Sequence, residues 1–399
     1  MILLNELAKN RLSSNPPKIS IFLWFLWFCL CLVPLDIAGY SINYLFVLTP
    51  VWAFLSGNKI NTFVPSVLGL YIFLSSLIFL VALLYQVGFY VFADRRLISF
   101  FIFMSQFSFL WFRFNINMLN AFFAAILSVG VLLSMHMLIK FLESDTGDIS
   151  QLKTIVGNQR YAFIYFFSIS SWFWFSKKYP NFSFRNVIQP FVIGVITLGI
   201  VLTFSRAAYV AFITGTLCSI FLINNPKPLK WLVLSVIPSL GVLLFVFKSL
   251  PELVDFINVQ IITFVSEGVM TKHLEASETS EGARLAIWKH LATFVFSNPL
   301  TGSGFLGSWV LAEWSGSAHS EYFDRFLRLG VIGFSIYCYI IIKLLIFLKN
   351  NNSSLLIGFI STLIFGLFHE TFSLSHGAVI LSLLLNLYTF ELKKQKSEE

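Results

Sequence analysis

The sequence predicts an all-helical, polytopic membrane protein with about twelve transmembrane helices. Apolar residues make up 57% of the 399 positions and charged residues only 12%, whereas a soluble domain carries about 25% charged residues. The mean hydropathy is +0.82. Apolar runs recur along the whole chain, and a membrane-spanning helix needs about 20 apolar residues, since its backbone groups must bond within the helix. Such spans would occupy residues 1–399 as a single membrane domain.

Each apolar run is assigned to one span. The expected spans are 19–35, 41–56, 64–88, 97–112, 118–141, 161–176, 187–204, 207–223, 231–248, 329–348, 354–370 and 376–391. The stretch 64–112 can be divided in more than one way, and 41–56 is short for a span. The boundaries of spans two to five therefore stay open.

Basic residues in the short loops set the expected orientation, because cytoplasmic loops are enriched in Lys and Arg. They follow spans six, eight, ten and twelve: Lys177, Lys178, Arg185, Lys227, Lys230, Lys349, Lys393, Lys394 and Lys396. Those loops and both termini should be cytoplasmic, in a cell inner membrane, and we read the first span as uncleaved. Arg95 and Arg96 break the pattern. The net charge of +8 fits this bias, so no nucleic-acid partner is expected.

The longest polar segment, 249–318, separates spans nine and ten and should form a large periplasmic loop. It holds seven acidic and three basic residues. Within it, 284–296 has the spacing of an amphipathic helix, which Asn298-Pro299 should end. A second helix should start near Ser317 and continue into span ten, with a break at Gly330 or Gly333.

Three basic residues are the main candidates for chemistry, and the predicted orientation places all of them on the periplasmic face. Arg206 lies in the turn between spans seven and eight, Arg284 begins the loop helix, and His319 lies where the loop re-enters the membrane. Arginine pairs bind and orient phosphate groups, and histidine can accept a proton from an attacking hydroxyl. The trio suits transfer of a group from a diphosphate. Alternatively, Arg206 extends to lipid headgroups or caps helix carbonyls.

These residues lie within an ordered set of motifs. The motifs are Ser205-Arg206-Ala207, Arg284-Leu285 with Trp288, Asn298-Pro299-Leu300 with Gly302 and Gly304, and His319 with Tyr322, Leu327 and Gly330-Val331-Ile332-Gly333. The set, over about 200–335, resembles the O-antigen ligase and O-antigen polymerase family. Two positions depart from the family pattern: Ser320 replaces the asparagine that usually follows the histidine, and Leu329 replaces a glutamate that often precedes the glycine.

The resemblance implies a membrane glycosyltransferase whose donor is a glycan linked to undecaprenyl diphosphate. It implies that His319 deprotonates the acceptor hydroxyl while Arg284 and Arg206 bind the donor diphosphate, with inversion at the anomeric carbon. It implies catalysis without a metal or cofactor, and the outer loops contain no Asp-x-Asp sequence. Asp145 and Asp148 are better explained as part of a solvated loop.

Secondary candidates are polar residues near the outer ends of spans. Arg160 could contact the donor phosphates or anchor a helix end. Glu321 could orient His319 or pair with Arg325 four residues later, and Tyr322 belongs to the same motif.

His369 and Glu370 lie at the outer end of span eleven. They could line the path by which the acceptor reaches the site, or they could be ordinary interfacial residues.

Three functions remain open, with a slight preference for the first. A ligase would transfer O-antigen to lipid A–core, and a polymerase would transfer a growing chain to a lipid-linked repeat unit. Both act among membrane lipids on the same donor, and the sequence leaves the sugars, the acceptor hydroxyl and the oligomeric state undefined. A lipid-linked glycan transporter is the third reading. Against it, the sequence has no two-fold hydropathy repeat and few charges at mid-membrane.

Overall fold

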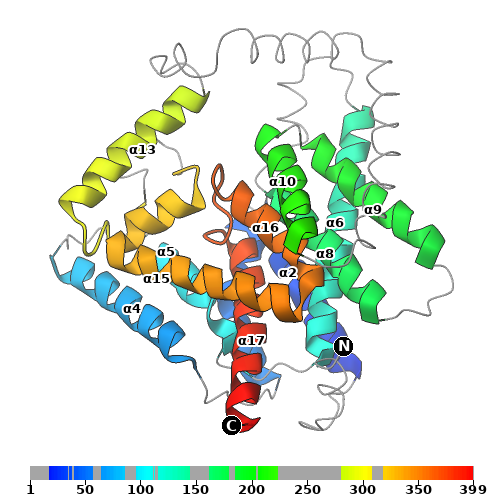
Figure 1. The fold of residues 1–399 in the computed structure, drawn as a ribbon, viewed down its shortest axis with the longest axis horizontal. Helices are drawn as coiled ribbons and strands as arrows, with labels where there is room; N and C mark the ends of the chain where they lie inside the picture. Colours follow the sequence, from blue (N-terminus) through cyan, green and yellow to red (C-terminus); the bar gives the residue numbers. More distant parts are fainter. Residues whose placement is uncertain are drawn as a thin grey trace. The chain divides into compact units, whose positions relative to one another are not determined.

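The computed structural model describes 18–34, 36–37, 40–56, 64–85, 96–110, 112, 116–143, 161–178, 185–203, 205–222, 280–307 and 318–398 (Figure 1). These residues form α-helices, short 3₁₀ segments and one two-stranded antiparallel ladder in which Asp36 pairs with Ser41. The chain divides into two compact units, and the boundaries between them fall within α6 (Ile116–Glu143), α13 (Ser280–Ser297) and η5 (Ser353–Leu355), and directly after α16 (Leu356–Phe365).

The first unit comprises Met1–Ile126, His290–Ser353 and Gly366–Glu399, and the second comprises Leu127–Lys289 and Ser354–Phe365. Elements of the first unit are α2 (Lys18–Leu32), β1 (Asp36–Ile37), β2 (Tyr40–Ser41), η1 (Ile42–Leu48), α3 (Thr49–Leu55), α4 (Ser66–Tyr85), α5 (Arg96–Ser105), η3 (Ser108–Leu110), α15 (Glu321–Asn351) and α17 (Ser375–Glu398). Elements of the second are α8 (Ala162–Lys178), α9 (Arg185–Leu202), α10 (Arg206–Leu222) and α16 (Leu356–Phe365).

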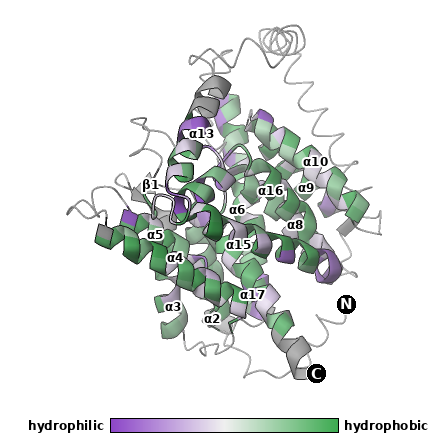
Figure 2. Cartoon of the chain, turned by 60° about the vertical axis from the view of Figure 1, so that its left-hand side comes forward, coloured by the Kyte–Doolittle hydropathy of each residue, from purple (hydrophilic) through white to green (hydrophobic). Residues whose placement is uncertain are grey.

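The described helices have the composition of membrane-spanning segments (Figure 2). Three of them are long and apolar enough to cross a bilayer: Ser66–Leu84, Asn117–Glu143 and Glu321–Asn351. Large apolar side chains also point outward at helical spacing, as Phe73, Leu77, Leu80 and Leu84 do along α4. Outward apolar stripes suit a lipid environment, so the chain is a membrane protein.

In the first unit, polar bonds tie the segment around η3 to α17. The Gln106 amide donates to the carbonyl of Phe372 at 2.6 Å, and the Asn386 amide donates to the carbonyl of Phe109 at 2.5 Å. Ser382 Oγ accepts from the Phe109 N–H at 3.2 Å. These side chains satisfy backbone groups that a continuous helix would have bonded internally.

In the second unit, small residues bring helix backbones close together. The N–H of Gly358 on α16 donates to Ser170 Oγ on α8 at 2.8 Å. Gly215 on α10 packs directly against Ser361 on α16, where any Cβ would collide. Close contacts between small residues are a common way for membrane helices to associate, because lipid offers no hydrophobic drive between them.

Most predicted spans correspond to helices, but three were wrong in their extent. The span 41–56 is broken, because 3₁₀ segment η1 precedes α3, whose first turn contains Pro50. The span 97–112 ends as an α-helix at Ser105, where the bonds to α17 take over. The span 354–370 ends at Phe365, since the carbonyl of Gly366 is bound by another segment.

Other expectations fall partly outside the described residues. These include the span 231–248 and most of the loop 249–318, of which 280–307 and Ala318 are described. The predicted loop helix 284–296 is present as α13, with Ile287, Leu291 and Val295 buried along one face.

Helix α15 is interrupted at Gly330, one of the two predicted positions. Gly330 has φ 64° and ψ −170°, a combination that essentially only glycine adopts. The segment that follows α13 packs against α15 at this break, where the Val331 N–H donates to the carbonyl of Pro299 at 2.8 Å. A Cβ on Gly330 would lie 2.5 Å from that oxygen and 2.8 Å from the carbonyl carbon of Leu300.

We predict that Gly330→Ala destabilises the protein by about 2 kcal/mol or more, because the alanine would be both strained and crowded by backbone. The matched control is Gly69→Ala on α4, where a Cβ meets nothing within 4 Å and helix propensity favours alanine by about 0.5–1 kcal/mol. Thermal unfolding of both variants in detergent measures the difference. Equal unfolding temperatures for the two would contradict the assigned strain.

Candidate active site

The helix that follows His319 begins with a side-chain cap. Ser320 is extended (φ −158°, ψ 132°), and its Oγ accepts from the Phe323 N–H at 3.5 Å. The same hydroxyl donates to the carbonyl of Gly366 at 3.3 Å. Glu321 and Asp324 occupy the first turn of α15, where acidic groups complement the positive end of the helix dipole.

His319 itself is half-buried and lies in the left-handed region, with φ 50°. Both of its neighbours are bonded to the connection between α16 and α17, residues 366–374. On one side, the Ala318 N–H donates to Glu370 Oε1 at 3.1 Å. On the other, Ser320 Oγ donates to the carbonyl of Gly366 at 3.3 Å, and the N–H of the next residue, Glu321, donates to the carbonyls of Gly366 at 2.8 Å and His369 at 3.2 Å. A strained backbone persists only where its surroundings fix it, and these bonds fix it here.

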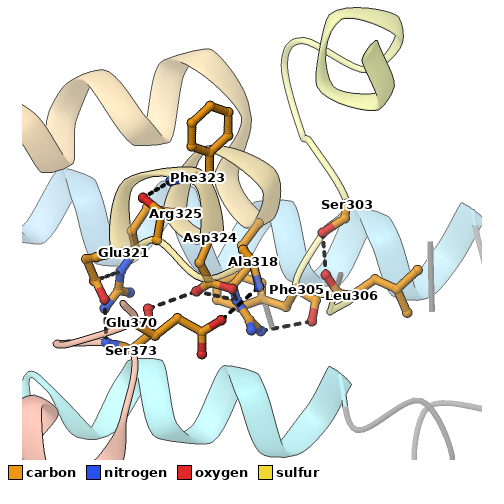
Figure 3. Close-up of polar contacts among 12 residues, drawn as sticks. Ser303, Phe305, Leu306, Ala318, Glu321, Phe323, Asp324, Arg325, Glu370 and Ser373 are labelled. Atoms are coloured by element: carbon orange, nitrogen blue, oxygen red, sulfur yellow. Dashed lines mark hydrogen bonds and ion pairs between the residues drawn. The ribbon is translucent and has the colours of Figure 1, made fainter. Parts of the chain in front are cut away.

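The first turns of α15 carry two ion pairs at i,i+4 spacing, and Figure 3 shows the contact between Glu321 and Arg325. This pair is almost fully buried. Arg325 Nε donates to Glu321 Oε1 at 2.8 Å, and each side chain is 2% exposed. The other carboxylate oxygen accepts from the N–H groups of Thr371 at 3.0 Å and Ser373 at 2.9 Å. Glu321 therefore links the start of α15 to the connection between α16 and α17.

The second pair links α15 to two segments. Arg328 Nε donates to Asp324 at 2.7 Å, and Ser373 Oγ donates to the same carboxylate at 2.8 Å. Arg328 Nη1 also donates to the carbonyl of Phe305 at 3.4 Å. The turn containing Phe305 is thus held on one flank of α15 and the connection 366–374 on the other.

Glu370 is the carboxyl group that accepts from the N–H of Ala318, next to His319. Burial raises the pKa of Glu370 to about 7, and the negative charges of Asp324 and Glu321 add to this shift. The Arg328 guanidinium and the hydrogen bond from Ala318 act in the opposite direction. The Glu370 carboxyl is therefore harder to ionise than an exposed glutamate.

The other residues singled out in the sequence lie in several places. Arg206 is exposed and begins α10, after a tight turn in which Ser205 Oγ accepts from the Ala208 N–H at 3.3 Å. Arg284 is in α13, with its side chain outside the described residues, and Arg160 lies outside them entirely. Arg206 belongs to the second unit and His319 to the first.

The first unit brings together the remaining candidates: His319, Glu321, Tyr322, His369 and Glu370. Tyr322 is half-buried on α15. Of the two roles considered for Glu321, the ion pair with Arg325 is present. The carbonyl of His369 accepts from the Glu321 N–H, and the carboxylate of Glu370 accepts from the Ala318 N–H.

Sequence reasoning missed Asp324, Arg328 and Ser373. The Asp324–Arg328 pair could have been found from its four-residue spacing, like that of Glu321 and Arg325. The Ser373 contact could not, because it joins residues 49 positions apart. Within the described ranges, no group of three or more His, Cys, Asp or Glu side chains could hold a metal ion.

Apolar helices and a histidine held at the start of α15 define a membrane protein with a polar site at the end of a helix. Residues 191–338 match the family model of O-antigen ligase. The match includes Arg206, Arg284 and His319, confirms the resemblance seen in the motifs, and supports a membrane enzyme of the O-antigen ligase or polymerase type. No curated protein matches the chain.

Proposed function

We propose that this protein is a membrane glycosyltransferase that moves O-antigen or a related glycan from undecaprenyl diphosphate to a hydroxyl group of lipid A–core. This is the ligase reaction of lipopolysaccharide biosynthesis, at the periplasmic face of the inner membrane, with both chain termini in the cytoplasm. The observation that carries the proposal is His319, which lies within the family match and has a left-handed backbone anchored on both sides.

In this reaction His319 is the general base. The imidazole accepts the proton of the acceptor hydroxyl as the oxygen attacks the anomeric carbon of the donor sugar. The new glycosidic bond forms as the bond to the diphosphate breaks, with inversion, and undecaprenyl diphosphate leaves with the electron pair. A base that acts on a large, lipid-bound acceptor must keep a fixed direction, and a fixed backbone at His319 supports this.

Arg206 and Arg284 would bind the donor diphosphate and stabilise the charge that grows on it as it leaves. Arg206 is exposed at the N-terminus of α10, where the helix dipole adds a partial positive charge that also favours anions. Arg160 is a third candidate for the same phosphates. The reaction needs neither a metal nor a cofactor, because two guanidinium groups supply the charge that a cation would otherwise provide.

The lipopolysaccharide profile of a strain lacking this gene tests the proposal. We expect core without O-antigen in the deletion strain, together with long glycan chains left on undecaprenyl diphosphate. The wild-type gene should restore attachment. Core that bears a single repeat unit would instead identify the protein as the polymerase, whose acceptor is a lipid-linked repeat. An unchanged profile would rule out both reactions for O-antigen.

A further inference from the structure

We propose that Glu370 is a positioning residue for His319, which it holds in its reactive orientation through the backbone N–H of Ala318. This inference rests on the proposed function of His319 as the base. It assigns to the connection between α16 and α17 a part in the reaction itself.

Glu370 and the other anchors bond to opposite sides of His319. On the C-terminal side, Ser320 and Glu321 bond to the carbonyls of Gly366 and His369. On the N-terminal side, the Ala318 N–H donates to the Glu370 carboxylate at 3.1 Å. The Glu370 side chain therefore orients the peptide group that precedes His319. A substitution at Glu370 removes this acceptor and leaves the backbone carbonyls on the other side in place.

The backbone conformation of His319 makes this control necessary. With φ 50°, His319 is one of two non-glycine residues with positive φ in the described parts of the chain. A left-handed conformation is unfavourable for an L-residue, so the segment relaxes toward an ordinary conformation if an anchor is lost. Relaxation at the Cα rotates the direction in which the imidazole leaves the backbone.

The position of Glu370 is itself fixed by the connection on which it lies. Its carboxyl lies among Asp324, Glu321 and Arg328, and Figure 3 shows it directed toward Ala318 beside the Asp324 carboxylate. Thr371 and Ser373, on the same connection, bond to the Glu321 carboxylate. Glu370 therefore lies on a connection that is hydrogen-bonded to α15, the helix that follows His319.

Three variants of the full-length protein in lipid vesicles test the inference, with extracted undecaprenyl-diphosphate-linked glycan as donor and lipid A–core as acceptor. Glu370→Ala removes the acceptor of the Ala318 bond. Glu370→Gln keeps an oxygen at the same reach without a charge, and Glu370→Asp keeps the charge on a shorter side chain. The control is Glu143→Gln, an exposed glutamate at the end of α6.

We expect Glu370→Ala to lower kcat by about 10- to 100-fold, the effect of a misplaced catalytic group, with KM and the unfolding temperature nearly unchanged. Glu370→Gln should restore kcat to within a few fold of the wild type and should exceed Glu370→Asp. The control should match the wild type.

Wild-type kcat in Glu370→Ala would overturn the inference. So would a folded Glu370→Gln that is no faster than Glu370→Asp, since the charge would then matter more than the bond. If Glu370→Ala does not fold, the order of the Gln and Asp variants decides. His319→Ala, assayed in parallel, separates the two ideas: full activity in that variant would sink the proposed function, whereas its loss beside an active Glu370→Ala would sink this inference alone.

Discussion

His319→Ala is expected to lower glycan transfer by about 100-fold or more, the usual contribution of a positioned general base. The imidazole is the group that would accept the proton of the attacking hydroxyl, and alanine offers no replacement. His319→Gln, which can form hydrogen bonds but cannot accept that proton at neutral pH, should be equally impaired. Transfer measured with purified protein and extracted donor and acceptor gives the comparison.

The left-handed backbone provides a second variant at the same position. His319→Gly removes the side chain and also relieves the positive φ, which glycine adopts without strain. We expect it to be inactive yet to unfold at a temperature no lower than that of the wild type, because strain at a functional site is relieved when function is lost. His290→Ala, at an exposed position on α13, is the control and should remain active. Normal transfer in either His319→Ala or His319→Gly would remove the base assignment.

The sequence predicted most helices because polar residues bound the apolar runs that form them. Helices α8, α9 and α10 begin and end within a few residues of the expected spans 161–176, 187–204 and 207–223. The break predicted at Gly330 or Gly333 is present at Gly330, since a glycine inside an apolar helix usually marks a special backbone position.

The misplaced ends depend on contacts between distant segments. Helix α5 ends at Ser105, where the side chain of Gln106 bonds to the carbonyl of Phe372, 266 positions away. Helix α16 ends before Gly366, whose carbonyl accepts from Ser320 and Glu321. Hydropathy along one run carries no information about such partners, so the expected spans 97–112 and 354–370 ran past the true helix ends.

For the site, as for the helices, the sequence predicted local features and missed those that depend on distant segments. The motif pattern pointed to His319 as a candidate, and four-residue spacing pointed to the pair of Glu321 and Arg325 as one of two roles for Glu321, because both signals are local. The left-handed backbone of His319 and the contact between Glu370 and Ala318 are tertiary features. The polar residues at the outer end of span eleven could therefore be noted in the sequence, whereas their action on the His319 backbone could not.

Glu321→Gln is expected to destabilise the protein by about 3–5 kcal/mol, the cost of leaving one member of a buried ion pair without its partner. The Arg325 guanidinium is buried, and within the described structure its Nη2 has no hydrogen-bond partner. The rings of Phe103 and Tyr337 lie 5.5 Å and 5.2 Å from it and offset only part of the loss, since such contacts contribute about 2 kcal/mol when desolvated.

The loss should be reversible by removing the second charge. Glu321→Gln combined with Arg325→Gln should regain part of the stability, because an apolar or neutral pair avoids the cost of burying a lone charge. Unfolding in detergent measures the single variants, the double variant and Glu143→Gln, an exposed control expected to change stability by less than about 0.5 kcal/mol. If Glu321→Gln unfolds at the wild-type temperature, the carboxylate does not hold α15 to the connection 366–374, and the anchoring of His319 must come from the backbone N–H of Glu321 and the side chains of Ser320 and Glu370.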